Sequence, residues 1–369
     1  MDPLAIAIIV MLTISVIVLI VVLTTTSGSG DGDGVNREVR EHPREPVGEY
    51  APPHPVDVVV TYLDQSDRDW IERYNRALEE ENNDYKHNNY GVNDEIHYNL
   101  ASMKFVPWVR KVWVLCQRGQ TPPPSDDPRV CVVYHDECAK NALDNHRVGD
   151  LLPHGETYNG MVTKALCSFI PGLATHYIQM DDDVHFTPDT RYAHFFTEEG
   201  TPIWRGNKTY VGITKEREEK SRRGSPYWCI ILNTWSLLSR EFPLYRSDYF
   251  LGGDHQPLPY RTEDVHKAFK ALPREVWRSM GKCRKATDVQ FSGYWVPNYL
   301  DMMTRLYPNR TPMLVTNDDP RFFDGHITND EKDRTVRDGA WSSVCFNHGF
   351  ETRDRTYMID MIGHDPSRK

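Results

Sequence analysis

The sequence lacks several patterns that would define a function class at once. It has no internal repeat with a period of roughly 20 to 50 residues, so a repeat architecture is not indicated. None of its seven cysteines forms a C-x-x-C pair, which argues against a zinc ribbon or a thioredoxin motif. It also lacks an excess of basic charge, because 43 Lys and Arg face 53 Asp and Glu, a net charge of −10 with histidine neutral. Such a field disfavours broad nucleic-acid binding and leaves open a local pocket for one nucleotide.

The composition is that of a folded protein. The 369 residues are 39% hydrophobic, 11% aromatic and 26% charged, which favours a globular chain over a disordered or collagenous one. The length fits one large domain or two ordinary ones. The seven cysteines permit at most three disulfides and one remaining thiol if the domain is lumenal, and the alternative is seven buried thiols.

One apolar run stands at the N-terminus. The residues Leu4–Leu23 contain only two polar side chains and span roughly 30 Å as a helix, which predicts a transmembrane anchor. A cleaved signal peptide is the alternative, although the early region has a single charge, Asp2, and no basic residue. Residues 24–55 are rich in Gly, Ser, Asp and Pro and predict a flexible linker, so the folded domain is expected over 56–369.

The compartment follows from two opposing signals. Arg37 and Arg40 follow the apolar run and weakly favour a cytosolic C-terminal side. The sequons at Asn207 and Asn309 are glycan acceptors if the domain is lumenal. We expect a single-pass membrane protein with its catalytic domain lumenal, in the Golgi or ER, or otherwise extracytoplasmic.

The folded part alternates strands with helices. Four apolar, β-branched runs have the length of buried strands: Val56–Tyr62, Val109–Cys116, Val130–Tyr134 and His176–Met180. Helical patterns cover Glu95–Phe105, Gly160–Phe169, Glu263–Leu272, Pro273–Met280 and Asp288–Leu306. This order predicts an α/β domain with a mostly parallel sheet flanked by helices and a more helical C-terminal half. Thr287, three residues before Gln290, has capping-box spacing for the last helix.

Ligands of parallel sheets bind beyond the carboxyl ends of the strands, where Asp64 and Asp181–Asp183 are expected. Three adjacent carboxylates repel one another, and a divalent cation offsets that repulsion when they are partly buried. A nucleotide-sugar enzyme uses such a cation against the diphosphate. The alternative is a solvated turn in which one Asp caps the next element.

Two further positions suit group transfer. His255 lies in a Gly- and Pro-rich loop, and an imidazole that titrates near neutrality suits a general base. Arg284 is placed to clamp a phosphate with its planar donors. The alternatives are an ordinary loop histidine and an ordinary helix terminus in which Thr287 and Asp288 cap the helix.

Taken together, the chain from about Val56 to Ile362 resembles the Stealth family of hexose-1-phosphotransferases, which includes capsular polysaccharide phosphotransferases. The resemblance lies in segments that share order and spacing with the family: VDVVVTYLDQSDRDW, NDEIHYNLASMKFVPWVRKVWVLCQRGQTPP followed by PRVCVVYHDE, LLPHGETYNGMVTKAL with IPGLATHYIQMDDDVHF, GGDHQPLP with CRKATDVQFSGYW, and SVCFNHGFE. Several positions depart from the family pattern. His97 and Ala101 replace arginines, Thr287 replaces an acidic residue and His348 replaces an Asp. In the first segment, Tyr62 replaces a Trp and Gln65 a Gly.

The resemblance implies transfer of a sugar 1-phosphate from a nucleotide diphosphate sugar to a hydroxyl of a glycan or glycoprotein acceptor. The expected donor is a UDP-sugar. It implies these roles: Asp57, Thr61 and Asp64 line the nucleotide; Asn159 and Gln290 bind the donor; Asp182 and Asp183 hold Mg²⁺ or Mn²⁺; His255 deprotonates the acceptor; Arg284 stabilises the transferring charge; and Asp288 joins the catalytic residues. No nucleic-acid partner is expected, and the membrane is contacted through the N-terminal helix.

Two other readings stay open. One is a metal-dependent glycosyltransferase, in which Asp181–Asp183 is the diphosphate-metal motif and the sugar itself moves. The other is a membrane-anchored relative that binds without turnover, motivated by the missing arginines at His97 and Ala101 and by His348.

Overall fold

The computed structural model describes residues 52–368 apart from 84–93, 149–150, 153–154, 206, 211–225, 244–248, 254, 308, 317–321, 326, 340 and 347–350. The predicted anchor Leu4–Leu23, most of the linker and His348 therefore lie outside the described residues. Among the residues that are described, no helix is both long and apolar enough to cross a bilayer.

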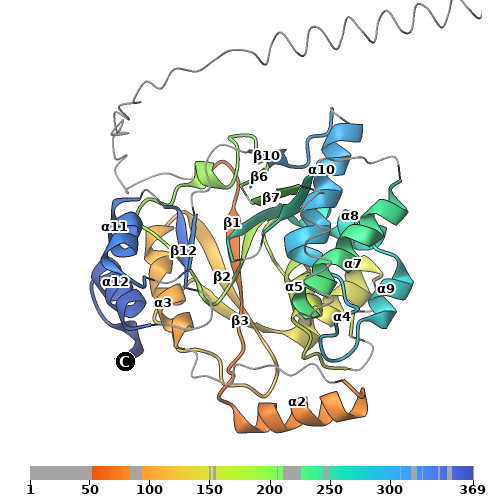
Figure 1. Ribbon diagram of the computed structural model, residues 1–369, viewed down its shortest axis with the longest axis horizontal. Coiled ribbons are helices and arrows are strands. Elements are labelled where there is room, and N and C mark those ends of the chain that lie inside the picture. Colours follow the sequence, from red (N-terminus) through yellow and green to blue (C-terminus); the bar gives the residue numbers. More distant parts are fainter. Residues whose placement is uncertain are drawn as a thin grey trace, which may run out of the picture. The chain divides into compact units, whose positions relative to one another are not determined.

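A five-stranded sheet forms the centre of the protein, in the order β3-β2-β1-β4-β9 (Figure 1). Its strands are β1 (Val56–Thr61), β2 (Val109–Cys116), β3 (Val130–Tyr134), β4 (His176–Asp181) and β9 (Leu258–Arg261). The first four are parallel, and β9 runs antiparallel to β4. The four predicted strands and the mostly parallel sheet are confirmed.

The β-branched run of β1 explains why this strand is central. Val58 and Val60 point to one face of the sheet, while Val59 points to the other, and all three are fully buried. A strand buried on both faces needs apolar side chains at most positions, which is typical of parallel sheets covered by helices.

Helices cover both faces of the sheet (Figure 1). Those described are α2 (Arg68–Glu80), α3 (Glu95–Ser102), α4 (His135–His146), α5 (Gly160–Leu166), α7 (Pro226–Glu241), α8 (Thr262–Ala271), α9 (Arg274–Ser279), α10 (Val296–Leu306), α11 (Asp330–Asp338) and α12 (Thr352–Ile362). In Figure 1, α3, α11 and α12 lie on one side of the sheet, and α4, α5, α8 and α9 lie on the other. The predicted helical C-terminal half is present.

Three smaller sheets complete the described structure. They consist of β5 (Val184–Phe186) with β12 (Ser343–Cys345) and β11 (Phe322–Asp324), of β6 (Ile203–Trp204) with β10 (Leu314–Val315), and of β7 (Asn207–Tyr210) with β8 (Tyr249–Gly252). Because β12 pairs antiparallel with β5, Cys345 lies opposite Val184. A residue near the end of the chain is thereby brought beside the acidic run.

The predicted start of the last helix is wrong. Residues 288–290 are not helical, and a π-helical turn over Phe291–Trp295 leads into α10 instead. The side chain that caps this turn belongs to Gln290, whose Oε1 accepts the amide of Gly293 at 2.9 Å. Thr287 is exposed and does not cap that turn. The neighbouring Asp288 carboxylate instead accepts the backbone amide of Lys285.

All seven cysteines are free thiols. Five are buried, and Cys131 and Cys229 are half-buried. The structure is therefore close to the second alternative of the sequence analysis, in which the thiols are buried and unpaired.

Candidate functional site

The site lies where the chain reverses its course through the sheet. From β1 the chain proceeds outward through β2 and β3, and then returns to the other side of β1 to form β4. In open α/β sheets, ligands bind outside the carboxyl ends of the strands at such a point. The carboxyl ends of β1 and β4 are Thr61 and Asp181, which are paired in register.

Asp181 is held by a hydroxyl and a cation. The Thr61 Oγ1 donates to Oδ1 at 3.0 Å, and the Lys164 Nζ of α5 lies 2.7 Å from Oδ2. Burial alone raises the pKa of Asp181, but the Lys164 ammonium and the Thr61 hydroxyl outweigh it and hold the pKa below its usual value. Asp181 is therefore an ionised carboxylate with defined partners.

Asp183 has a different environment. Its Oδ1 is buried and has no hydrogen-bond partner among the described residues. Burial and the neighbouring charge of Asp181 raise the pKa of Asp183. One donor atom each from Asp183, His255 and Cys345 lies within 4.8 Å of the other two. Asp181 and Asp183 therefore differ although they are only two residues apart. The Asp181 carboxylate is paired with the Lys164 ammonium, whereas the Asp183 carboxylate lies near the negative charge of Asp181.

The turn that carries these carboxylates is fixed from α3. The amide of Asn99, which is fully buried, donates to the backbone carbonyl of Asp181 at 3.3 Å and to that of Val184 at 2.5 Å. These two bonds hold both ends of the acidic turn, so its geometry is set by the protein interior.

Asp64 and Asp182 face the same phenol. Burial raises the pKa of Tyr62, and the charges of Asp64 and then Asp182 raise it further. Asp64 also accepts the amide and the hydroxyl of Ser66 at 2.9 and 2.6 Å. Thr61, Asp64, Asp182 and Asp183, all predicted for the site, therefore converge on the carboxyl edge of the sheet.

His255 reaches this edge on a constrained loop. Its backbone has φ +59°, a left-handed conformation that is uncommon outside glycine. Just before it, a Cβ on Gly253 would lie 2.1 Å from the ring of Trp204, so only glycine allows the loop to pack this closely. This close packing holds the segment that carries the half-buried imidazole of His255.

Asn159 and Asp288 form a buried pair beside the site. Asn159 caps α5 by accepting the Met161 amide at 3.0 Å, and its Nδ2 donates to Asp288 Oδ2 at 2.7 Å. That oxygen also accepts the Lys285 amide at 2.9 Å. Burial raises the pKa of Asp288 to about 6. These contacts join the start of α5, which carries Lys164, to the segment that carries Arg284.

The position of the Arg284 segment is also fixed by residues just after the end of α2. The side chain of Glu81 accepts the amides of Lys282 and Cys283 at 2.6 and 3.3 Å, and Asn83 donates to the Arg284 carbonyl at 3.0 Å. Gln290 is buried and caps the following turn. Asn159, Asp288 and Gln290 thus have observed structural contacts, and their predicted roles toward substrate stay predictions.

Asp57 is not brought to this group. It lies near the amino end of β1, and its buried carboxylate accepts hydrogen bonds from Arg110, the Trp113 indole and the Ala174 amide, all between 2.7 and 2.9 Å. Thr61, four residues further on, lies at the other end of the same strand. The structure thus gives Asp57 a set of contacts inside the protein, far along the strand from the acidic turn.

Lys164 and Cys345 were not among the predicted site residues. Lys164 lies one turn into the helix that Asn159 caps, so a cation near the acidic run could have been sought there. Cys345 has no local signal, because only the pairing of β12 with β5 brings it to Asp183.

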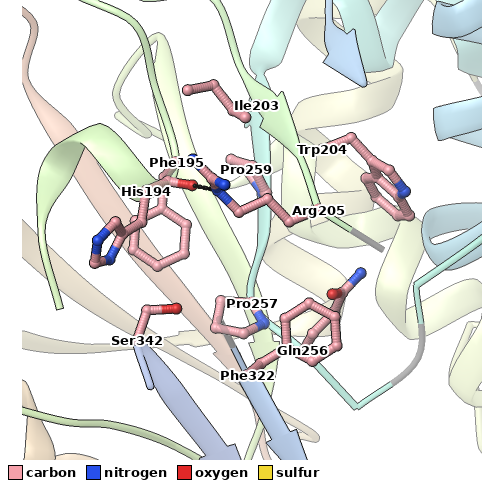
Figure 2. A pocket seen from close by; sticks show the side chains of 10 residues that line it. All are labelled: His194, Phe195, Ile203, Trp204, Arg205, Gln256, Pro257, Pro259, Phe322 and Ser342. Carbon is pink, nitrogen blue, oxygen red and sulfur yellow. Dashed lines mark hydrogen bonds between the residues drawn. The ribbon is translucent and has the colours of Figure 1, made fainter. Parts of the chain in front are cut away.

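A shallow pocket with room for about one water molecule lies beside the loop that carries His255 (Figure 2). Its lining includes Gln256 and Pro257, which directly follow His255, together with Phe195, Trp204, Arg205 and Phe322. Figure 2 shows the hydrogen bond that the Arg205 side chain donates to the His194 carbonyl. The distance from Nε to the carbonyl oxygen is 2.9 Å. The pocket offers apolar rings with a few polar groups.

Comparison with known proteins establishes the family, although no family model matches the chain. Capsular polysaccharide phosphotransferase LcbA of Neisseria meningitidis is 30% identical over 268 residues, which cover 70% of this chain and 68% of that protein. A capsular polysaccharide phosphotransferase of Neisseria meningitidis serogroup B is 27% identical over 263 residues, covering 68% of this chain and 66% of the relative. LcbA of Aeromonas hydrophila is 24% identical over 255 residues, covering 66% and 65%.

The chain therefore belongs to the Stealth-type family of capsular polysaccharide phosphotransferases, as its motifs predict. It spans about two thirds of the length of these three relatives.

Proposed function

We propose that this protein transfers a sugar 1-phosphate from a nucleotide diphosphate sugar, in the first instance a UDP-sugar, to a hydroxyl of a glycan or glycoprotein acceptor. The observation that carries the proposal is the acidic turn at the switch point of the sheet, with Lys164 on Asp181 and His255 beside Asp183. The phosphotransferase names of the relatives support the reaction class.

Phosphoryl transfer requires alignment, charge neutralisation and a base. Thr61 and Asp64 lie at the end of β1 and in the loop after it, where the nucleotide of the donor would bind. His255 takes the proton from the attacking acceptor hydroxyl, and the bond between the two phosphates of the donor breaks as the nucleoside monophosphate leaves. The positive charge of Arg284 stabilises the transferring group.

The residues present fit a divalent cation. Asp183 has a buried oxygen without a hydrogen-bond partner in the described part of the chain, and its environment disfavours a bare negative charge. Asp182 and Asp183 would hold Mg²⁺ or Mn²⁺, both of which favour carboxylate oxygens. When bound, the cation offsets the charge of the donor diphosphate.

The buried side chains around Asn159 hold the backbone next to the proposed site. Asn159, Asp288 and Gln290 keep the start of α5 and the Arg284 segment in register, so that Lys164 and Arg284 are presented toward the donor from two directions.

The proposed location is a single-pass membrane protein with a lumenal or extracytoplasmic catalytic domain. The support is the apolar run Leu4–Leu23 and the two sequons, of which Asn309 is exposed. Loss of a mass shift at Asn309→Gln in protein from secretory cells would support lumenal placement. Absence of glycan at both sequons would remove this support.

The test incubates the full chain with Mg²⁺, a panel of nucleotide sugars and simple glycoside acceptors, and identifies the released nucleotide by mass. Release of a nucleoside monophosphate and a phosphodiester product is expected. Release of a diphosphate with a plain glycosidic product would instead establish the glycosyltransferase. Donor binding without turnover across the panel would favour the inactive relative. Chelation with EDTA should stop the reaction, and full activity in chelator would contradict the cation.

A further inference from the structure

One cluster at this site has a chemistry that the proposed reaction does not require. Asp183, His255 and Cys345 come from the turn after β4, the loop before β9 and the end of β12. One ligand atom from each lies within 4.8 Å of the other two. The carboxylate is part of the proposed Mg²⁺ or Mn²⁺ site, but a thiol is not a ligand that Mg²⁺ selects.

We propose that Asp183, His255 and Cys345 form a binding site for a soft divalent transition metal ion, of which Zn²⁺ is the leading candidate, and that this ion inhibits the enzyme.

The donor set carries the choice of ion. One thiolate, one imidazole nitrogen and one carboxylate oxygen are the three ligand types that Zn²⁺ accepts in proteins, and three protein ligands leave a fourth position for water or substrate. Thiolate and imidazole ligands select Zn²⁺ or Co²⁺ over Mg²⁺, whose preferred ligands are oxygens.

The geometry requires only a small contraction. Zn²⁺ ligands at about 2.0 to 2.3 Å from the metal lie roughly 3.5 Å apart in a tetrahedron. The present separations reach no more than 4.8 Å, so the three atoms need to approach one another by only about 1 Å to share one ion. The backbone around them is already held, because Cys345 pairs with Val184 and Asn99 fixes the carboxylate turn.

A second observation points to a ligand at this place. The Asp183 Oδ1 is buried without a hydrogen-bond partner among the described residues. A buried carboxylate oxygen with no donor is costly unless it is protonated or binds a cation. A metal ion held by the three donors would satisfy this oxygen.

The inhibition rests on the proposed function. A metal ion on the imidazole of His255 occupies the electron pair that would accept the proton of the acceptor hydroxyl. The ion also takes Asp183 from the proposed Mg²⁺ or Mn²⁺. Zn²⁺ and Mg²⁺ are therefore expected to compete, and the protein would be active only where free Zn²⁺ is scarce.

The experiment measures binding separately from turnover. Co²⁺ is titrated into the purified, metal-free full chain, with and without competing Zn²⁺, and absorption is recorded. One Co²⁺ per chain, a thiolate-to-cobalt charge-transfer band in the near ultraviolet and its loss on adding Zn²⁺ are expected. Cys345→Ser should remove that band and weaken Co²⁺ binding by about tenfold or more. The half-buried thiol of Cys131 is the matched control, and Cys131→Ser should keep the band.

Three outcomes would overturn the site: no thiolate band in the parent chain, a band that survives in Cys345→Ser, or a band lost in Cys131→Ser. Far-ultraviolet circular dichroism and thermal unfolding show whether each variant is folded. If Cys345→Ser does not fold, His255→Gln serves instead, and an unchanged cobalt spectrum in that variant overturns the site.

The inhibition has its own readout. In the transfer assay, Zn²⁺ should inhibit the parent chain competitively with Mg²⁺, and Cys345→Ser should need about tenfold more Zn²⁺ for half-inhibition of its own rate. Equal sensitivity of the two proteins would overturn the inhibition. If no transfer occurs with any donor, the proposed function fails, whereas the cobalt titration still decides the metal site.

Discussion

The two ends of the central sheet use the same residue type in opposite ways. At the amino end, Asp57 is fully buried and accepts hydrogen bonds from a guanidinium, an indole and a backbone amide. At the carboxyl end, Asp183 has a buried oxygen without a donor among the described residues and lies close to Asp181.

This difference separates structure from function on physical grounds. A carboxylate with several donors stabilises the fold, since each bond to a charged group contributes about 1.5 to 3 kcal/mol. A carboxylate crowded by like charge destabilises the fold, and its presence at a switch point indicates a ligand. The sequence shows one aspartate within a strand and another just after a strand, and only their partners in the folded chain distinguish them.

The largest expected effect is on stability at the amino end. Asp57→Ala leaves the Trp113 indole and the Ala174 amide buried without an acceptor, and should lower the free energy of unfolding by about 3 kcal/mol or more. Urea denaturation measures it. Arg110→Ala is the control with a smaller effect, because 42% of that side chain is exposed. A stable Asp57→Ala protein that fails to bind nucleotide would restore the role implied by the family resemblance.

The next effect is on turnover at the carboxyl end. His255→Ala should lower the rate of transfer by about 100-fold or more and leave the fold intact, because the proposed general base is lost. The steady-state rate at saturating donor and acceptor measures it. The exposed His364 is a matched control, and His364→Ala should act as the parent does. An active His255→Ala enzyme would remove His255 from the mechanism.

A smaller effect of opposite sign is expected for Asp183→Asn. Since the folded protein raises the pKa of Asp183, its ionisation costs stability, and that cost grows as the pH rises through the raised pKa. The variant carries no charge there and should be more stable than the parent by up to about 1 kcal/mol at pH 8, with a smaller difference at pH 4. Thermal unfolding at both pH values tests this. A variant that is less stable than the parent at pH 8 would show that the Asp183 carboxylate stabilises the fold, as the Asp57 carboxylate does.

The smallest effect at neutral pH is expected for Asp288→Asn. The pKa of Asp288 rises from 3.8 to about 6 on folding, so the parent loses stability as the pH rises through this range. The variant keeps an oxygen for the amides of Asn159 and Lys285 and should lack this pH dependence, with stability within about 1 kcal/mol of the parent at pH 7.

Turnover decides the role of Asp288. A positioning residue predicts a modest loss of rate in Asp288→Asn, while Asp288→Ala should also unsettle the start of α5. The alternative is a catalytic Asp288. It would be supported if Asp288→Asn is folded, its stability does not depend on pH in this range, and its rate loss is as large as that of His255→Ala.

The fold was largely predictable because its signals are local. The runs that form β1 to β4 are rich in β-branched and other apolar residues, as is typical of parallel strands covered by helices, and each was found within one residue of its bounds. β9 was missed because Pro259 lies within it, and proline favours an edge position over a central strand. The predicted start of the last helix, at Asp288, was wrong. The Asp288 side chain does not cap a helix there but accepts a hydrogen bond from Asn159, 129 residues away in sequence.

The site was predictable only in part, for a related reason. The rule that ligands bind beyond the carboxyl ends of parallel strands places Asp64 and Asp181–Asp183 together from sequence alone, and the family resemblance adds Thr61. It says nothing of Lys164, which reaches Asp181 from a helix, or of Cys345, which reaches Asp183 through the pairing of two short strands.

The sequence by itself determined the α/β class, the mostly parallel character of the central sheet, the acidic residues at its carboxyl edge and the family. These follow from apolar periodicity and from motifs that are read along the chain. The tertiary structure alone decided which carboxylates are satisfied, which thiol joins the acidic turn, and which end of β1 serves the site. Hydrogen bonds and desolvation depend on distances between groups far apart in sequence, and only the folded chain sets those distances.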